Sequence, residues 1–220
     1  MNSTPATEDY LKTIYHLEQA KEIVNTTDIA KDMKVSMASA SNMIKRLSKD
    51  GFLRHEPYKG VQLTPKGEKF ILKLVRRHRL LELFLTQVLK MDWDKVDDEA
   101  ERLEHVISDE LEGKIDELLG FPETDPHGDP IPKSDGTIAK PKQENLSKVI
   151  PGKKVVISRV SDHNPAILRY LNELKMLPNT RIEIIRQEPF NGPILVKVRG
   201  KQHHIGQEVA NAIYVEVVKK

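Results

Sequence analysis

Two short amphipathic segments separated by a turn, and followed at once by two strand-like runs, occupy residues 27–64. Thr27 opens the first segment, TDIAKDM. Ser36 is a suitable N-cap for the second segment, whose apolar residues keep the helical period of about 3.6 residues until Gly51. The runs FLRHE and VQLT, joined by PYKG, are typical of a β-hairpin. With a further amphipathic helix expected over residues 7–20, this order predicts a winged helix-turn-helix.

The second helix of this unit has a small, polar outer face inside a basic region. Between Lys34 and Lys69 there are eight basic and three acidic residues, a local net charge of +5. Small and amide-bearing side chains can reach base edges in the major groove, and basic side chains suit phosphate contact. We therefore expect DNA binding, because a winged helix used only for protein contact gives no reason for such a face. The candidate DNA contacts are Ser36, Ala38, Ser39, Ser41, Asn42, Lys45, Arg46 and Lys59.

Three side chains with metal-binding character recur at helical spacing in the stretch EAERLEHVISDE. Glu101, Glu104 and His105 lie at offsets i, i+3 and i+4, which places them on one face of a helix expected over residues 97–120. From residue 92 to residue 117 there are twelve acidic and three basic residues, a local net charge of −9 in a chain of net charge +2. A bound cation would relieve this repulsion, whereas a solvated acidic surface is the alternative.

Further candidate ligands lie on other helices. His78 and Glu82 have i, i+4 spacing in a long helical region that begins near Pro65, and Asp9 lies on the first amphipathic helix. Carboxylate and imidazole groups suit Mn(II), Fe(II) or Zn(II). Three helices could therefore converge on a metal ion. The chain has no cysteine, which excludes thiolate catalysis, disulfides and Cys-ligated zinc.

The length and composition indicate a globular protein of several small parts. At 220 residues the chain can hold two or three small domains. No apolar run approaches the roughly 18 residues of a membrane helix, and the N-terminal sequence lacks the features of a secretion signal, so we expect a cytoplasmic protein. Proline, glycine and polar residues after Gly120 predict a loop that becomes a linker. Beyond Val149, strand-like runs around one helical segment predict a small β-barrel.

In combination, these segments resemble the diphtheria toxin repressor family of metal-dependent transcriptional repressors, specifically its manganese-responsive branch. The resemblance covers nearly the whole chain and is carried by TEDYLKTIYHLE, the wing YKGVQLTPKG, RRHRLLE, DEAERLEHVISDE and PETDPHGDPIP. It implies a mainly α fold with β: a winged helix-turn-helix, a helical metal-binding and dimerisation domain, and an SH3-like small β-barrel of the ferrous-transport type. The boundaries we expect are 1–71, 72–127, a linker over 128–148, and 149–220.

The resemblance also implies two metal sites. The primary site maps onto Asp9, Glu101, Glu104 and His105. The second site maps onto His78, Glu82, Asp125, His127 and Asp162, although His78 could serve either site. Iron-type members have a methionine and a cysteine where this chain has Asp9 and Glu101, so the harder donors favour Mn(II), with Fe(II) as the alternative and Zn(II) as a substitute in vitro. Lys12 replaces a glutamate ligand of the two-domain manganese regulators, so we expect two separate sites in place of a closely spaced binuclear cluster. Asp125 stands where cysteine is common in similar proteins; it is still a suitable ligand, but it makes the second site harder.

The expected function is a metal-dependent repressor in which the metal is the co-repressor, and not an enzyme. A homodimer would bind palindromic operator DNA, without a membrane partner, and would control metal-uptake genes. One alternative is a winged-helix regulator with a non-metal effector, whose acidic helix is a docking face. A di-iron enzyme would need two Glu-x-x-His repeats, but Glu101 and His105 are four residues apart and have no second copy. Activation at some promoters, instead of repression, stays open.

Overall fold

The structure, a computed structural model, describes residues 4–56, 59–161 and 164–217. It divides into two compact units: the first comprises the chain up to Arg77 together with Pro132–Thr137, and the second comprises His78–Ile131 together with the chain from Ile138 onward. Residues 57–58 of the expected hairpin turn, and Asp162 of the expected second metal site, lie outside the described residues. None of the described helices is both long enough and apolar enough to cross a bilayer.

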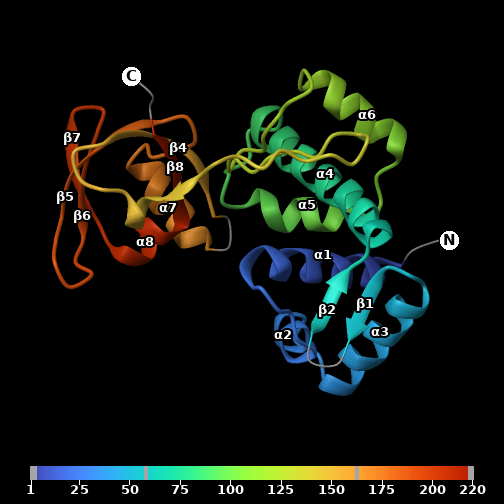
Figure 1. Ribbon diagram of the computed structural model, residues 1–220. Helices are drawn as coiled ribbons and strands as arrows, with labels where there is room; N and C mark the ends of the chain where they lie inside the picture. Colours follow the sequence, from blue (N-terminus) through green and yellow to red (C-terminus); the bar gives the residue numbers. More distant parts are fainter. Residues whose placement is uncertain (1–3, 57–58, 162–163, 218–220) are drawn as a thin grey trace. The chain divides into compact units, whose positions relative to one another are not determined.

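The first unit forms the predicted winged helix-turn-helix (Figure 1). Its elements are α1 (Pro5–Ala20), α2 (Thr26–Asp32), α3 (Met37–Lys49), β1 (Leu53–Glu56), β2 (Gly60–Leu63) and the first turns of α4 (Pro65–Gln87). The α3 helix begins where predicted because Ser36 Oγ accepts a hydrogen bond from Ser39 N at 3.1 Å. Ile14, Ile29 and Ile44 are fully buried, so α1, α2 and α3 share one core.

The wing is tied to the region around α1. Leu63 N donates a hydrogen bond to Glu18 Oε1 at 2.8 Å, and Val61 N donates one to Val24 O at 2.8 Å. Partial burial raises the pKa of Glu18 above its ordinary value. Gly60 has φ 81°, and a Cβ there would lie 2.4 Å from Val24 O. The hairpin can therefore approach this closely only with glycine at that position.

The helical part of the second unit contains a break that the sequence pattern did not predict. We expected one helix over residues 97–120, but the structure has α5 (Val96–Glu104) and α6 (Asp109–Leu118). Ser108 accepts a hydrogen bond from Leu111 N at 3.1 Å and caps α6, whose first turn is acidic and suits a helix start. His105 lies at the C-cap of α5 and keeps helical angles, φ −82° and ψ −15°. The break therefore leaves Glu101 and His105 at helical spacing.

The C-terminal part of the second unit is a six-stranded antiparallel sheet with short helices (Figure 1). Its strands are β3 (Glu144–Asn145), β4 (Lys154–Val160), β5 (Arg181–Gln187), β6 (Ile194–Val198), β7 (Lys201–Ile205) and β8 (Ile213–Val217), and its helices are η1 (Leu146–Lys148), α7 (Pro165–Glu173) and α8 (Gln207–Ala212). The strand order is β3-β8-β4-β5-β6-β7. Among the described residues β3 and β7 lie at the two edges, so the strands of the expected SH3-like small β-barrel form an open sheet and do not close.

Candidate metal centres and DNA-binding helix

His78, in the middle of α4, lies among four carboxylates. Its ring is buried, with 8% of the side chain exposed. On one side, Nδ1 lies 2.5 Å from Glu104 Oε2 and 3.8 Å from Glu101 Oε2. On the other side, Nε2 lies 3.3 Å from Asp97 Oδ1 and 3.7 Å from Glu82 Oε1. One ring nitrogen therefore faces residues of the expected primary site, and the other faces a residue of the expected second site.

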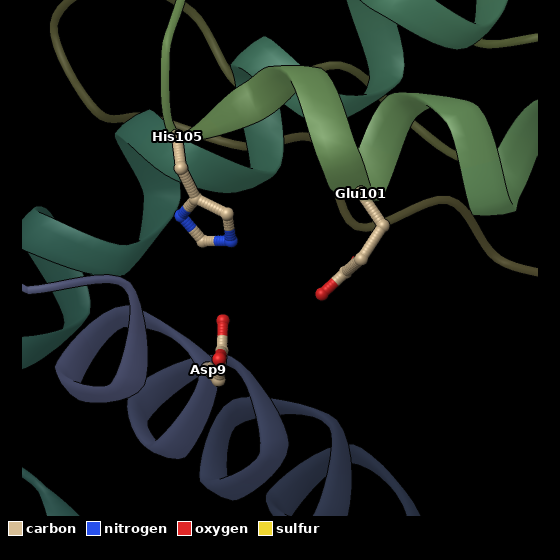
Figure 2. A group of neighbouring side chains, drawn as sticks. All are labelled: Asp9, Glu101 and His105. Carbon is tan, nitrogen blue, oxygen red and sulfur yellow. The ribbon is translucent and has the colours of Figure 1, made fainter.

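The end of α5 supplies three of the expected primary ligands. Glu104 is fully buried, and His105 Nε2 lies 3.7 Å from Glu104 Oε1. Glu101 has 46% of its side chain exposed, so it can be reached from solvent. Figure 2 shows Glu101 and His105 projecting from the same face of this helix. The remaining expected ligand, Asp9, is a half-buried residue of α1 in the first unit.

Glu82, Asp125 and His127 form a second, fully buried group. Each offers one ligand atom, and these atoms lie within 4.8 Å of one another. His127 Nδ1 is 3.4 Å from Glu82 Oε1. Among the described residues no donor forms a hydrogen bond with this Glu82 oxygen, although it is buried. A buried carboxylate oxygen beside an imidazole nitrogen fits a divalent cation, which would satisfy both.

Asp125 is held by its own loop. Its Oδ1 accepts hydrogen bonds from His127 N at 2.8 Å and from Asp129 N at 2.9 Å, and its Oδ2 lies 3.6 Å from Arg79 Nε. Burial, followed by the negative charges of Glu82 and Asp129, raises the pKa of Asp125 well above its ordinary value. The carboxyl group therefore sits where a nearby positive charge would stabilise its ionised form.

Asp97 is a candidate ligand that our reading of the sequence missed. With His78 and Glu82 it forms another group whose ligand atoms lie within 4.8 Å of one another. Its side chain is 56% exposed, so it borders solvent. The available signal was its position exactly four residues before Glu101, one helical turn away on the same face. His78 and Glu82, which were predicted for the second site, therefore also form a ligand group with Asp97 of α5.

The predicted DNA contacts lie on the outer side of α3 and on the wing. Seven of the eight lie on α3 or at its N-cap, and of these only Ser41 is half-buried. The other six are exposed: Ser36, Ala38, Ser39, Asn42, Lys45 and Arg46. Lys59 on the wing is exposed and pairs with Glu56 at 2.7 Å. The first turn of α3 carries no acidic residue, which leaves the positive end of its dipole available to an anion.

A winged helix-turn-helix joined to a helical domain with clustered oxygen and nitrogen ligands defines a metal-dependent DNA-binding regulator. Three family models match the chain in this order: "Iron dependent repressor, N-terminal DNA binding domain" at residues 3–61, "Iron dependent repressor, metal binding and dimerisation domain" at residues 64–133, and "FeoA domain" at residues 144–217.

Similar proteins match over nearly the whole chain or over about half of it. The iron-dependent repressor IdeR of Mycobacterium leprae is 30% identical over 96% of this chain and 97% of its own length. The regulator MntR of Bacillus pumilus is 40% identical over 54% of this chain and 82% of its own length. A solved structure of a manganese-dependent transcriptional repressor in complex with manganese is 38% identical, covers 96% of this chain and 100% of its own, and superposes with a TM-score of 0.89.

The chain therefore belongs to the iron-dependent repressor family, which includes the diphtheria toxin repressor. This confirms the family resemblance. The chain is a metal-dependent, DNA-binding transcriptional repressor with a dimerisation domain, and not an enzyme.

Proposed function

We propose that this repressor responds to manganese, with Mn(II) as its co-repressor, and that it controls metal-uptake genes. The observation that carries the proposal is the chemistry of the two ligand groups. His78 with Glu101 and Glu104, and Glu82 with Asp125 and His127, offer only carboxylate oxygen and imidazole nitrogen. Such donors suit Mn(II) and, as the second choice, Fe(II), whereas thiolate donors would favour softer metals. The similarity to a manganese-dependent repressor supports the same choice.

In this proposal the primary site consists of Asp9, Glu101, Glu104 and His105. Asp9 belongs to the unit that contains the DNA-binding helix, and the other three belong to the unit that contains the dimerisation domain. A bound divalent cation supplies a positive charge that these ligands share. Asp9 and the end of α5 would then hold one arrangement of the two units, which the metal-free protein samples only part of the time. Linkage requires operator DNA to tighten metal binding by the same factor.

The second site, in this proposal, consists of His78, Glu82, Asp125 and His127, with Asp162 as a further candidate. Arg79 and the loop hydrogen bonds would hold the Asp125 carboxylate in place as a ligand. Asp97 adds an oxygen next to His78 and Glu82. The site would stabilise the second unit, while the primary site would govern DNA binding.

The proposed assembly on DNA is a homodimer on a palindromic operator. Apolar side chains are exposed on and beside α5 and α6 in the domain that the family uses for dimerisation: Val106, Leu111, Leu118 and Phe121. A twofold pair would cover them and would present two α3 helices to successive major-groove faces. The base contacts would come from the small polar face of α3, and Lys45, Arg46 and Lys59 would contact phosphates. Such a repressor would act in the cytoplasm, without a membrane partner.

The metal preference can be tested by equilibrium binding. Chelator-stripped protein would be titrated with Mn(II), with Fe(II) under anaerobic conditions, and with Zn(II), and the bound metal would be counted for the wild type and for Glu104→Gln. We expect more than one Mn(II) per chain in the wild type and the loss of one in Glu104→Gln. Equal stoichiometry in both proteins would contradict the primary site. DNA binding without any metal uptake would favour a non-metal effector and an acidic docking face.

A further inference from the structure

Trp93 connects two parts of the second unit. It lies in the turn before α5, yet its side chain is not part of the core of the helical domain, which contains Leu80, Val96 and Ile115. Its indole is buried in the core of the C-terminal sheet, among residues that include Leu146 and Val155. The helical domain therefore inserts one large side chain into the core of the FeoA-type domain.

The same residue holds the ring of His127. The indole and imidazole rings stack, with centroids 5.4 Å apart and planes 25° from parallel. Trp93 O lies 2.8 Å from His127 Nε2. A carbonyl oxygen can only accept, so in the neutral ring the proton lies on Nε2 and the lone pair lies on Nδ1. Nδ1 is the atom that faces Glu82 Oε1 in the buried group with Asp125.

Strand β4 holds His127 from the other side. Val160 N donates a hydrogen bond to His127 O at 2.8 Å. The next residue, Gly128, has φ 90°, and a Cβ there would lie 2.0 Å from Ser158 O of β4. The loop that carries His127 is therefore packed directly on a strand whose buried side chains belong to the same core as Trp93. Contacts from the helical domain and from β4 therefore meet at His127.

An open cavity of about 480 Å³ lies beside this contact. Its lining comes from both parts of the unit and includes Trp93, Asp125 and Pro126 from the helical side, and Asn172 and Pro178 from the C-terminal side. A hydrated cation could reach Asp125 through such a space, since Asp125 is both a lining residue and a member of the buried group. If the helical domain and the C-terminal domain separated, the cavity would widen and the His127 ring would lose its contacts at the same time.

We propose that Trp93 is the positioning residue of the second metal site, and that it links occupancy of this site to docking of the C-terminal domain on the helical domain. The inference rests on the proposed function, because it needs a metal at the group of Glu82, Asp125 and His127. Trp93 contacts no metal in this scheme. Its backbone oxygen sets the tautomer of His127, its indole stacks on the imidazole ring, and the same indole anchors the C-terminal domain. By reciprocity, docking strengthens metal binding and metal binding strengthens docking.

The test uses the full-length protein and Mn(II) alone. Trp93→Ala removes the ring that stacks on His127 and that packs in the C-terminal core, whereas Trp93→Phe keeps an aromatic ring there. Leu168→Ala, on α7, creates a cavity in the same core and is the control. We expect Trp93→Ala to weaken Mn(II) at the second site by about 10- to 100-fold, the range for lost supporting contacts to ligands. Trp93→Phe should restore most of the affinity, and Leu168→Ala should leave it within about threefold. Equal losses in Trp93→Ala and Leu168→Ala would reduce Trp93 to a core residue.

Two readouts in the wild-type protein do not depend on the variants. The ring ¹⁵N chemical shifts of His127 should show a proton on Nε2 in the metal-free protein. For the metal-bound state, diamagnetic Zn(II) replaces Mn(II) so that the same shifts can be measured. Hydrogen exchange at Val160 N should slow by about 10-fold when Mn(II) fills the second site. A proton on Nδ1, or unchanged exchange at Val160, would overturn the inference.

Failure of the inference can be separated from failure of the second site itself. If His127→Ala binds as many Mn(II) ions as the wild type, the site is wrong and the inference falls with it. If His127→Ala loses one ion while Trp93→Ala keeps it at unchanged affinity, the site stands and the positioning role of Trp93 is wrong. The chain has a single tryptophan, so its fluorescence follows this contact directly in the wild-type titration.

Discussion

His78 Nδ1 and Glu104 Oε2 lie 2.5 Å apart in the interior of the second unit, while Nε2 of the same ring faces Asp97 and Glu82. A single imidazole thus adjoins both proposed metal sites. The ring lies on α4 between the two groups, and it cannot turn toward one group without leaving the other. This relationship gives the first prediction.

His78→Ala should weaken Mn(II) binding at both sites, because each group loses a nitrogen that faces it. Glu82→Gln should weaken only the second site. The expected loss is about 10-fold or more for each affected site, measured from the free Mn(II) signal in electron paramagnetic resonance. If His78→Ala changes one site alone, the ring serves that site only.

Asp97→Ala should weaken the group formed with His78 and Glu82 by about 10-fold. Asp98, the next residue on α5, is an exposed acid of the same charge and is not part of any such group, so Asp98→Ala is the matched control. Isothermal titration calorimetry would compare the two. Equal effects would show that Asp97 contributes only to the general negative charge of the helix.

Asp125 predicts opposite pH trends for metal-free stability and for metal binding. Burial raises its folded-state pKa well above the ordinary value, so the folded protein binds this proton more tightly than the unfolded chain does. Its contribution to metal-free stability is fully present below the unfolded pKa, and it is lost as the pH rises through the raised, folded pKa. A metal needs the ionised carboxylate, so affinity at the second site should fall as the pH falls through that same range.

Asp125→Asn separates these two trends. It removes the cost of burying the charge, so the metal-free variant should melt at a higher temperature than the wild type near neutral pH, and its stability should depend less on pH. The same variant should bind one fewer Mn(II). Thermal unfolding by circular dichroism with and without chelator measures both effects. A metal-free variant that is less stable than the wild type at neutral pH would contradict the assignment.

We expect substitutions on the DNA-binding helix α3 to reduce DNA affinity in two different ways. Lys45→Ala should reduce affinity for operator and random DNA alike and should lower the slope of affinity against salt by about 1. Asn42→Ala should cost about 1–3 kcal/mol on the operator, with little change on random DNA. Fluorescence anisotropy over a series of salt concentrations distinguishes them. The reverse pattern would place Lys45 on a base and Asn42 on the backbone.

Local signals account for the parts of the fold that the sequence predicts well. The period of the apolar residues and the Ser36 cap predicted α3, because both act within a few residues of the chain. The break between α5 and α6 was missed because Ser108 lies inside an otherwise periodic acidic run, where a cap looks like an ordinary helix residue. The open sheet was missed because the edges at β3 and β7 depend on pairing between distant strands.

The candidate metal groups show the same limit. Spacing along one helix suggested Glu101, Glu104 and His105, and the structure keeps them together at the end of α5. Spacing could not show that Asp97 would meet His78, since the two lie on different helices. Nor could it show that Trp93 would stack on His127 and enter a core formed mostly by residues after position 145. Such contacts arise from packing between distant segments.

The central claim is that metal occupancy governs DNA binding. The most direct test is fluorescence anisotropy of chelator-stripped protein on DNA fragments selected from its own genome, with Mn(II), anaerobic Fe(II) and Zn(II) titrated in parallel, and with Glu104→Gln beside the wild type. We predict tight binding by the wild type only when metal is present, a midpoint order that identifies the preferred metal, and weak binding by Glu104→Gln throughout. Equal binding by the wild type with and without metal would contradict the account.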